Sequence, residues 1–123
     1  MTYDRELADR VRAVLSTEPG VSEKAMFGGL AFLLDGAMAV AVAGQDGLMV
    51  RSDPARADEF TAAEGVERMV MRGRALDGWL LVAPQALDDD TPDDRALRGW
   101  VATGRDAARS GPAPRRAGST RTR

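Results

Sequence analysis

Residues 35–43 read Asp-Gly-Ala-Met-Ala-Val-Ala-Val-Ala, and this stretch decides the fold. From Ala37 onward, large and small side chains alternate, which is the period of a β-strand that packs one face in a core. Asp35-Gly36 precedes the alternation, and an Asp-Gly pair between two apolar runs is a strong signal of a tight hairpin turn. The stretch therefore predicts a turn followed by a half-buried antiparallel strand.

The same signals recur on both sides of this stretch. Gln45-Asp46-Gly47 is a second turn signal, and the apolar run Leu-Met-Val-Arg follows it at residues 48–51. Residues 21–51 accordingly predict three antiparallel strands in sequential order. Gly28-Gly29 falls inside the first predicted strand, where we expect a bulge or a close backbone approach.

A helix is predicted ahead of the first strand. Thr2 is a suitable N-cap for a helix that starts at Tyr3, because a hydroxyl can accept from the free amides of the first turn. Pro19-Gly20 ends it. The apolar stripe of this helix consists of Leu7, Val11, Val14 and Leu15.

The second half of the chain repeats the order of helix and strands. Asp53-Pro54 begins a short helix that runs to about Ala63 and is closed by Gly65. Residues 67–72 and 79–82 are predicted strands, and Asp77-Gly78 is the predicted turn between them. Thr91-Pro92-Asp93-Asp94 resembles a capping box, and it precedes a last helix that carries the apolar residues Leu97, Trp100, Val101 and Ala108.

These elements predict an α+β protein with the order α-β-β-β-α-β-β-α, in which helices cover one face of an antiparallel sheet of about five strands. Residues 1–110 form the predicted domain, with 13 basic and 19 acidic residues. Residues 111–123 contain no large apolar side chain, so we expect a disordered basic tail.

The composition argues against an enzyme. The chain has no cysteine and no histidine, which excludes thiol nucleophiles, zinc–thiolate sites and the usual general base at neutral pH. Neither a glycine-rich cofactor loop nor a Gly-x-Ser-x-Gly element is present. The acidic residues 88–90, 93 and 94 lack the spacing of a calcium loop and are typical of an acidic helix start. We therefore expect no catalytic residue, no cofactor and no metal.

The N-terminal residues carry charges where a signal peptide needs an apolar run, and no segment reaches the roughly 20 apolar residues of a membrane helix. These features predict a cytoplasmic protein without membrane association.

Several segments together resemble the N-terminal domain of the TfoX/Sxy family. The resemblance is carried by Lys-Ala-Met-Phe-Gly-Gly-Leu-Ala-Phe at residues 24–32, Asp-Gly-Ala-Met at 35–38, Gly-Leu-Met-Val-Arg at 47–51, Met-Arg-Gly-Arg-Ala-Leu-Asp-Gly-Trp at 71–79 and Val-Ala-Pro at 82–84. It covers residues 3 to about 109, which is the whole predicted domain.

The resemblance implies a secretion-chaperone-like α/β fold and a role as a regulator of the kind that controls natural competence through transcription, together with partners. Two-domain members of the family carry an additional helical C-terminal domain, and this chain has only the basic tail in that place. The implied function is a non-catalytic regulatory or adaptor domain that binds another protein or forms a homodimer.

Two groups of residues are candidates for binding. Met26, Phe27, Gly28 and Gly29 either form a recognition surface, since adjacent glycines admit a ligand backbone, or form a β-bulge with Met and Phe in the core. The basic residues Lys24, Arg51, Arg72 and Arg74 either share the face away from the helices as an anion-binding patch or are solvated strand ends paired with Glu23, Glu67 or Asp77.

The alternative function is weak, sequence-independent binding of nucleic acid through the basic strand positions and the tail. The tail arginines are Arg115, Arg116, Arg121 and Arg123, and a merely solubilising tail is the other interpretation. Trp79 and Trp100 are predicted core anchors, because only six aromatic residues are present and no paired stacking platform is evident.

Overall fold

The computed structural model describes residues 4–26, 29–42, 47–71, 73–87 and 94–110. The α-helices are α1 (Arg5–Val14), α2 (Ala57–Thr61) and α3 (Arg95–Ser110). The strands are β1 (Val21–Met26), β2 (Gly29–Leu34), β3 (Ala37–Val42), β4 (Leu48–Arg51), β5 (Val66–Met71) and β6 (Arg74–Val82). Short 3-10 turns follow α1 at Leu15–Thr17, precede α2 at Pro54–Arg56 and follow β6 at Pro84–Ala86.

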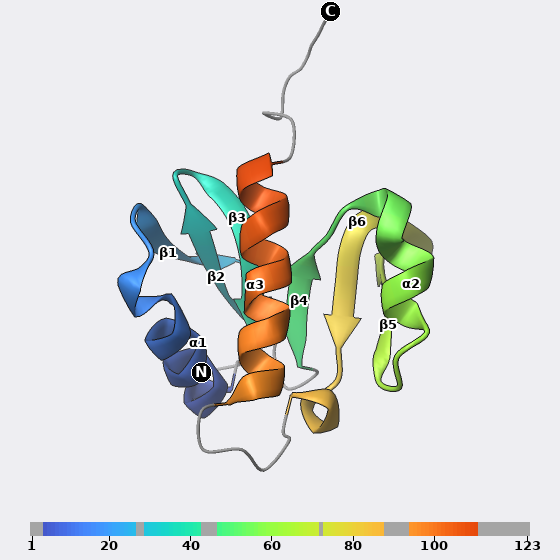
Figure 1. The fold of residues 1–123 in the computed structure, drawn as a ribbon, viewed down its shortest axis with the longest axis horizontal. Coiled ribbons are helices and arrows are strands. Elements are labelled where there is room, and N and C mark those ends of the chain that lie inside the picture. The colour runs from blue at the N-terminus through green and yellow to red at the C-terminus, as the bar shows by residue number, and fades with distance from the viewer. Residues whose placement is uncertain (1–3, 27–28, 43–46, 72, 88–93, 111–123) are drawn as a thin grey trace, which may run out of the picture.

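The strands form one antiparallel sheet in the order β1-β2-β3-β4-β6-β5. Figure 1 shows the three described α-helices on one side of this sheet, with α3 lying along its middle. Helix α3 packs on β3 and β4, and α2 packs on β5 and β6. The predicted α+β class, with helices on one face of an antiparallel sheet, is confirmed.

The sheet has one strand more than the approximate prediction, because residues 21–34 form two strands. β1 and β2 are antiparallel neighbours, paired from Val21 with Leu34 to Met26 with Gly29. The expectation of a single strand with Gly28-Gly29 as an internal bulge is therefore wrong. Adjacent glycines are compatible with either a bulge or a chain reversal, and here the chain reverses between the two strands.

The predicted hairpin at Asp35-Gly36 is confirmed, and it joins β2 to β3. Asp35 has φ 51° and Gly36 has φ 89°, as a two-residue type I′ turn requires. Leu34 and Ala37 close the turn as paired residues. A type I′ turn matches the twist of the flanking strands, which explains why the Asp-Gly pair predicted this hairpin correctly.

The predicted turn at Asp77-Gly78 is wrong, because both residues lie inside β6. The chain reverses instead near Gly73, which has φ 78°. Gly78 also has a positive φ, 86°, but it uses that conformation in an irregularity where the pairing shifts from Arg68–Leu80 to Val70–Ala75. An Asp-Gly pair predicts a residue with positive φ, and such a residue occurs in β-bulges as well as in turns.

The helix boundaries differ partly from expectation. Asp4, and not Thr2, caps α1, and its side chain accepts a hydrogen bond from the Leu7 amide at 3.1 Å. The Asp53 cap is confirmed, since its carboxylate accepts from the Ala55 amide at 2.9 Å. The predicted capping box at residues 91–94 falls largely outside the described residues.

The main core lies between the helices and the sheet. Its fully buried side chains include Val11 of α1 and Leu97 of α3, which meet Phe32 and Leu80 from the strands. Trp100 packs against this core and contacts Phe60 edge-on at 5.7 Å between ring centroids. None of the described helices is long and apolar enough to cross a membrane.

Candidate binding face

The side of the sheet away from the helices presents two rows of side chains, which we call the open face. Directly paired residues on antiparallel strands point to the same side of a sheet, so the strand register defines each row. The first row crosses all six strands in the order Lys24, Ala31, Ala41, Met49, Leu81 and Glu67. The second row contains Ser22, Leu33, Met38, Arg51 and Trp79.

The centre of the open face is apolar. Ala31, Ala41 and Met49 are buried and form a cluster separate from the main core. The apolar side chains packed around them are only partly buried: Leu33, Met38, Met69, Trp79 and Leu81. Helices α1, α2 and α3 all lie on the other side of the sheet (Figure 1), so no described helix covers this cluster. A contiguous apolar surface of this kind commonly marks an interaction site.

Arg51 stands within this apolar surface. Its Nε donates a hydrogen bond to the Met38 carbonyl oxygen at 2.6 Å, and its guanidinium carbon lies 4.9 Å from the centre of the Trp79 ring. The guanidinium is partly buried, and loss of water lowers the pKa of Arg51 below its ordinary value. Among the side chains that the structure describes, no carboxylate forms an ion pair with it. Six other arginines have such partners, namely Arg10, Arg12, Arg56, Arg68, Arg105 and Arg109.

The irregularity in β6 fixes the position of Trp79. Gly78 has a positive φ, and its carbonyl oxygen accepts a hydrogen bond from the Ser52 amide at 2.8 Å. Ser52 directly follows Arg51, so this bond ties the end of β4 to the residue before Trp79. The Arg51–Trp79 pair is therefore held by backbone geometry on both strands.

Of the eight candidate binding residues, Lys24 and Arg51 lie on the open face. They stand on β1 and β4, three strand spacings apart, or roughly 14 Å. The structure thus does not bring these two charges together. Gly29 is buried at the start of β2 and pairs with Met26 of β1.

The other candidates fall wholly or partly outside the described residues. Met26 and Arg74 are described only as backbone in β1 and β6. Phe27, Gly28, Arg72 and the tail residues Arg115, Arg116, Arg121 and Arg123 lie outside the described ranges. Trp79, predicted as a core anchor, instead belongs to the open face, where its pairing with Arg51 was not foreseen.

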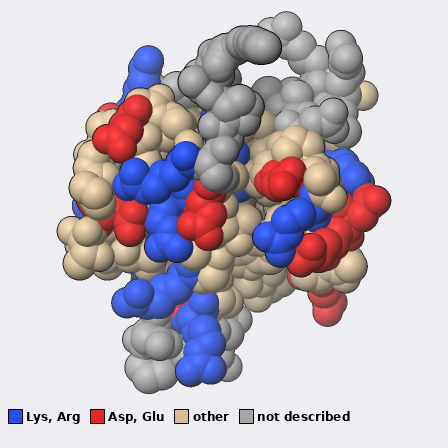
Figure 2. Space-filling view, turned by 45° about the horizontal axis from the view of Figure 1, so that its top comes forward, with Lys and Arg blue, Asp and Glu red and all other residues tan. Residues whose placement is uncertain are grey.

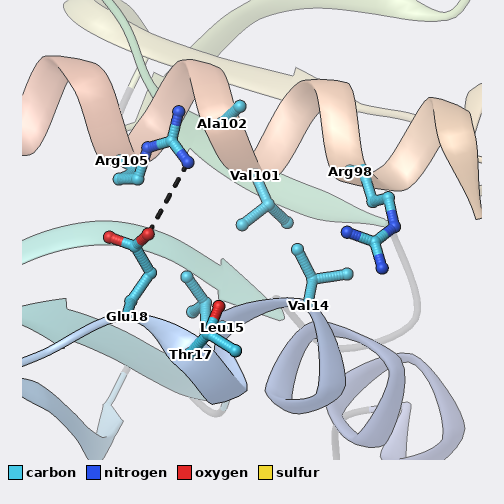
Figure 3. A pocket seen from close by; sticks show the side chains of 8 residues that line it. All are labelled: Val14, Leu15, Thr17, Glu18, Arg98, Val101, Ala102 and Arg105. Atoms are coloured by element: carbon cyan, nitrogen blue, oxygen red, sulfur yellow. Dashed lines mark ion pairs between the residues drawn. The ribbon is translucent and has the colours of Figure 1, made fainter.

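The helix side of the molecule offers a different feature, a groove of about 250 Å³ between the end of α1 and α3 (Figure 3). Glu18 points toward α3 across the groove, and it forms ion pairs with Arg105 at 3.7 Å and Arg109 at 3.3 Å. The residues that line the groove are Val14, Leu15, Thr17, Glu18, Arg98, Val101, Ala102 and Arg105. The ion pairs join the two helical segments, which gives this groove a structural explanation.

Charges of both signs are interspersed in the view of Figure 2. Ion pairs on the helix side include that of Arg10 with Asp94 at 2.8 Å and that of Arg12 with Glu23 at 2.7 Å. Among the described residues no group of three or more acidic side chains could hold a metal ion. Arg51, which forms no ion pair with a described side chain and stands on an apolar surface, is thus the candidate binding residue of this face.

One comparison with known proteins gave a match. The family model described as the TfoX N-terminal domain matches residues 13–108. No curated protein and no solved structure matches the chain.

Proposed function

This chain belongs to the TfoX N-terminal domain family, and on that premise we propose that it is a regulatory domain that acts by binding another protein on its open face. The family is non-enzymatic and regulatory in character. More specifically, we propose that it acts as an adaptor in the control of transcription or in competence-type regulation.

One observation carries this proposal: the open face is an apolar surface on the side of the sheet that the described helices leave uncovered. Methionine is flexible and polarisable, so a surface rich in it adapts to the shape of a partner. Met38 and Met69 are partly exposed there, around the buried Met49. Tryptophan and arginine, the residue types most often found at the energetic centre of protein interfaces, adjoin these methionines as Trp79 and Arg51.

Nucleic-acid binding is the weaker candidate. Sequence-independent binding needs several cations that follow a phosphate backbone. Lys24 and Arg51, the two described candidates, are separated by apolar strands. The apolar surroundings of Arg51 favour a protein ligand over a phosphate backbone.

The experiment is co-purification from the native host, with the full chain carrying an affinity tag. Leu81→Glu places a carboxylate in the middle of the open face, at a side chain that is only partly buried. Val70→Glu is the matched control, because Val70 is 54% exposed and lies on the edge strand β5, outside both rows of the open face.

We expect one protein, identified by mass spectrometry, to be lost with Leu81→Glu and retained with Val70→Glu. Co-purification of an untagged copy would identify that protein as a second copy of the chain. Retention of every co-purified protein by a correctly folded Leu81→Glu variant contradicts the proposal.

A further inference from the structure

We propose that Arg51 and Trp79 form a receptor for a carboxylate that the partner protein supplies, an Asp or Glu side chain flanked by apolar residues. This inference rests on the proposed function, and it adds the chemistry by which the partner is recognised.

The first argument is the fixed orientation of the guanidinium group. Its Nε donates to the Met38 carbonyl oxygen, and its central carbon lies 4.9 Å from the centre of the Trp79 ring. Neither terminal nitrogen of Arg51 donates to another described residue. The two terminal nitrogens of a guanidinium carry parallel N–H groups that match the two oxygens of a carboxylate. A guanidinium that is already oriented loses little conformational entropy when the carboxylate binds.

The second argument is that no described side chain supplies a counter-charge to Arg51. A guanidinium stays ionised at neutral pH even where burial lowers its pKa, so Arg51 places a positive charge in an apolar surrounding. Covering this face with a purely apolar partner would bury the charge without compensation, which is costly. A partner carboxylate removes that penalty, and it also distinguishes the correct partner from other apolar surfaces.

Arg56 shows what a satisfied site of the same kind looks like. Its guanidinium carbon lies 4.5 Å from the centre of the Phe60 ring, and its Nη2 also contacts a Glu59 carboxylate oxygen at 2.7 Å. Arg51 has the aromatic ring but no carboxylate among the described residues. By this comparison, a carboxylate from another molecule would complete the Arg51 site in the way that Glu59 completes the Arg56 site.

The surroundings select a carboxylate over a phosphoryl group. Phosphate is more strongly hydrated and carries more charge, and its sites usually combine several donors. The described contacts of Arg51 on the open face are with Met38 and Trp79, and Lys24 stands three strands away, at roughly 14 Å. A singly charged acid on an apolar stem fits this environment.

The test uses NMR on the full chain with three small probes: sodium hexanoate, neutral hexanamide and inorganic phosphate. The readouts are the Nε–H resonance of Arg51 and the indole N–H resonance of Trp79. Hexanoate should shift both signals saturably, with a dissociation constant at least several-fold lower than that of hexanamide or phosphate. Equal binding of hexanoate and hexanamide would overturn the carboxylate site, and stronger binding of phosphate would overturn the choice of ligand.

Three variants test whether hexanoate binds at Arg51. Arg51→Gln should weaken hexanoate binding on the order of tenfold, because it removes the charge-assisted hydrogen bonds. Arg51→Lys keeps the positive charge but loses the paired N–H donors of the guanidinium, and it should weaken hexanoate binding several-fold. Arg56→Gln, the matched control, should leave binding unchanged. Hexanoate binding that is insensitive to both substitutions of Arg51 overturns this inference.

Failure of this inference and failure of the proposed function give different results. Hexanoate binding that ignores Arg51, together with loss of the co-purified partner in Leu81→Glu, overturns the carboxylate receptor and retains the open face as the interface. If Leu81→Glu retains the partner, the open face is not the interface, and Arg51 is then not part of a partner-binding site.

Discussion

Arg51 and Trp79 are directly paired across β4 and β6, and the guanidinium carbon of Arg51 lies 4.9 Å from the centre of the Trp79 ring. The two strands are neighbours in the sheet although β5 lies between them in the sequence. This pairing brings a cation and the largest aromatic side chain together in the middle of an apolar surface.

The pair should be coupled in stability. A cation over an indole ring contributes about 0.5–1 kcal/mol at an exposed site and more where water is excluded. A double-mutant cycle with Arg51→Met and Trp79→Leu, measured by urea unfolding, should therefore give a coupling free energy of about 1 kcal/mol. Additive effects of the two substitutions would show that the ring does not hold the guanidinium.

The contact of α3 with β3 depends on a glycine. A Cβ at Gly104 would collide with the Ala39 carbonyl oxygen and lie 2.7 Å from Cγ1 of Val40. Because the obstacle is partly backbone, Gly104→Ala should push the helix away and lower the free energy of unfolding by about 1–3 kcal/mol.

Gly99 is the control for this effect in the same helix. A Cβ there would have no atom within 4 Å apart from its chain neighbours and the nearby backbone of its own helix. Gly99→Ala should raise the free energy of unfolding by about 0.5–1 kcal/mol, since alanine favours the helix more than glycine does. Equal effects of the two substitutions in urea unfolding would contradict the close approach of α3 to β3.

Ser52 carries a buried hydroxyl without a partner. The residue is 4% exposed, and its Oγ makes no hydrogen bond to the residues that the structure describes. Ser52→Ala keeps the backbone bond to Gly78 and removes an unsatisfied polar group. We expect the free energy of unfolding to stay equal or to rise by up to about 1 kcal/mol, again measured in urea. A loss of more than about 1 kcal/mol would mean that the hydroxyl has a partner.

Acid sensitivity follows from the pair of Arg12 and Glu23. The hydrogen bond and charge of Arg12 lower the pKa of Glu23 below its ordinary 4.5. A depressed pKa in the folded state adds stability above the ordinary value, and this contribution is lost as the pH falls through the folded-state value. Both side chains are substantially exposed, 48% and 34%, so the contribution should stay below about 1 kcal/mol.

Glu23→Gln should therefore be less stable than the natural chain at neutral pH, and the two should converge as the pH falls below 4.5. Glu64→Gln is the control, because Glu64 is exposed and forms no ion pair among the described residues. Thermal unfolding between pH 3 and 7 measures both differences. A Glu23→Gln difference that stays constant over this range contradicts the linkage.

The local signals in the sequence predicted the class of fold and most of its elements. Asp35-Gly36 is a turn because both residues adopt a positive φ between strands that are adjacent along the chain. Asp77-Gly78 is the same sequence signal, but it lies within β6. There the Gly78 carbonyl oxygen accepts a hydrogen bond from the amide of Ser52, the residue that follows β4. Only the tertiary neighbour decides between a turn and a bulge, and that neighbour is distant in sequence.

The site was predictable in part for the same reason. Arg51 stood out as a cation at the end of an apolar strand, and Trp79 as one of two tryptophans. Their contact depends on β4 lying beside β6, which is a long-range pairing that no turn signal encodes. That no described carboxylate pairs with Arg51 also depends on the tertiary structure, because the sequence contains 19 acidic residues.

The measurement that tests the central claim most directly is site-specific photo-crosslinking in living cells. Benzoylphenylalanine is placed in the full chain at position 81, on the open face, or at position 62, an exposed residue at the end of α2 on the helix side. We predict a discrete adduct with one protein from position 81 and none from position 62. Adducts of equal yield from both positions, or an adduct from position 62 alone, would contradict the assignment of the open face as the binding surface.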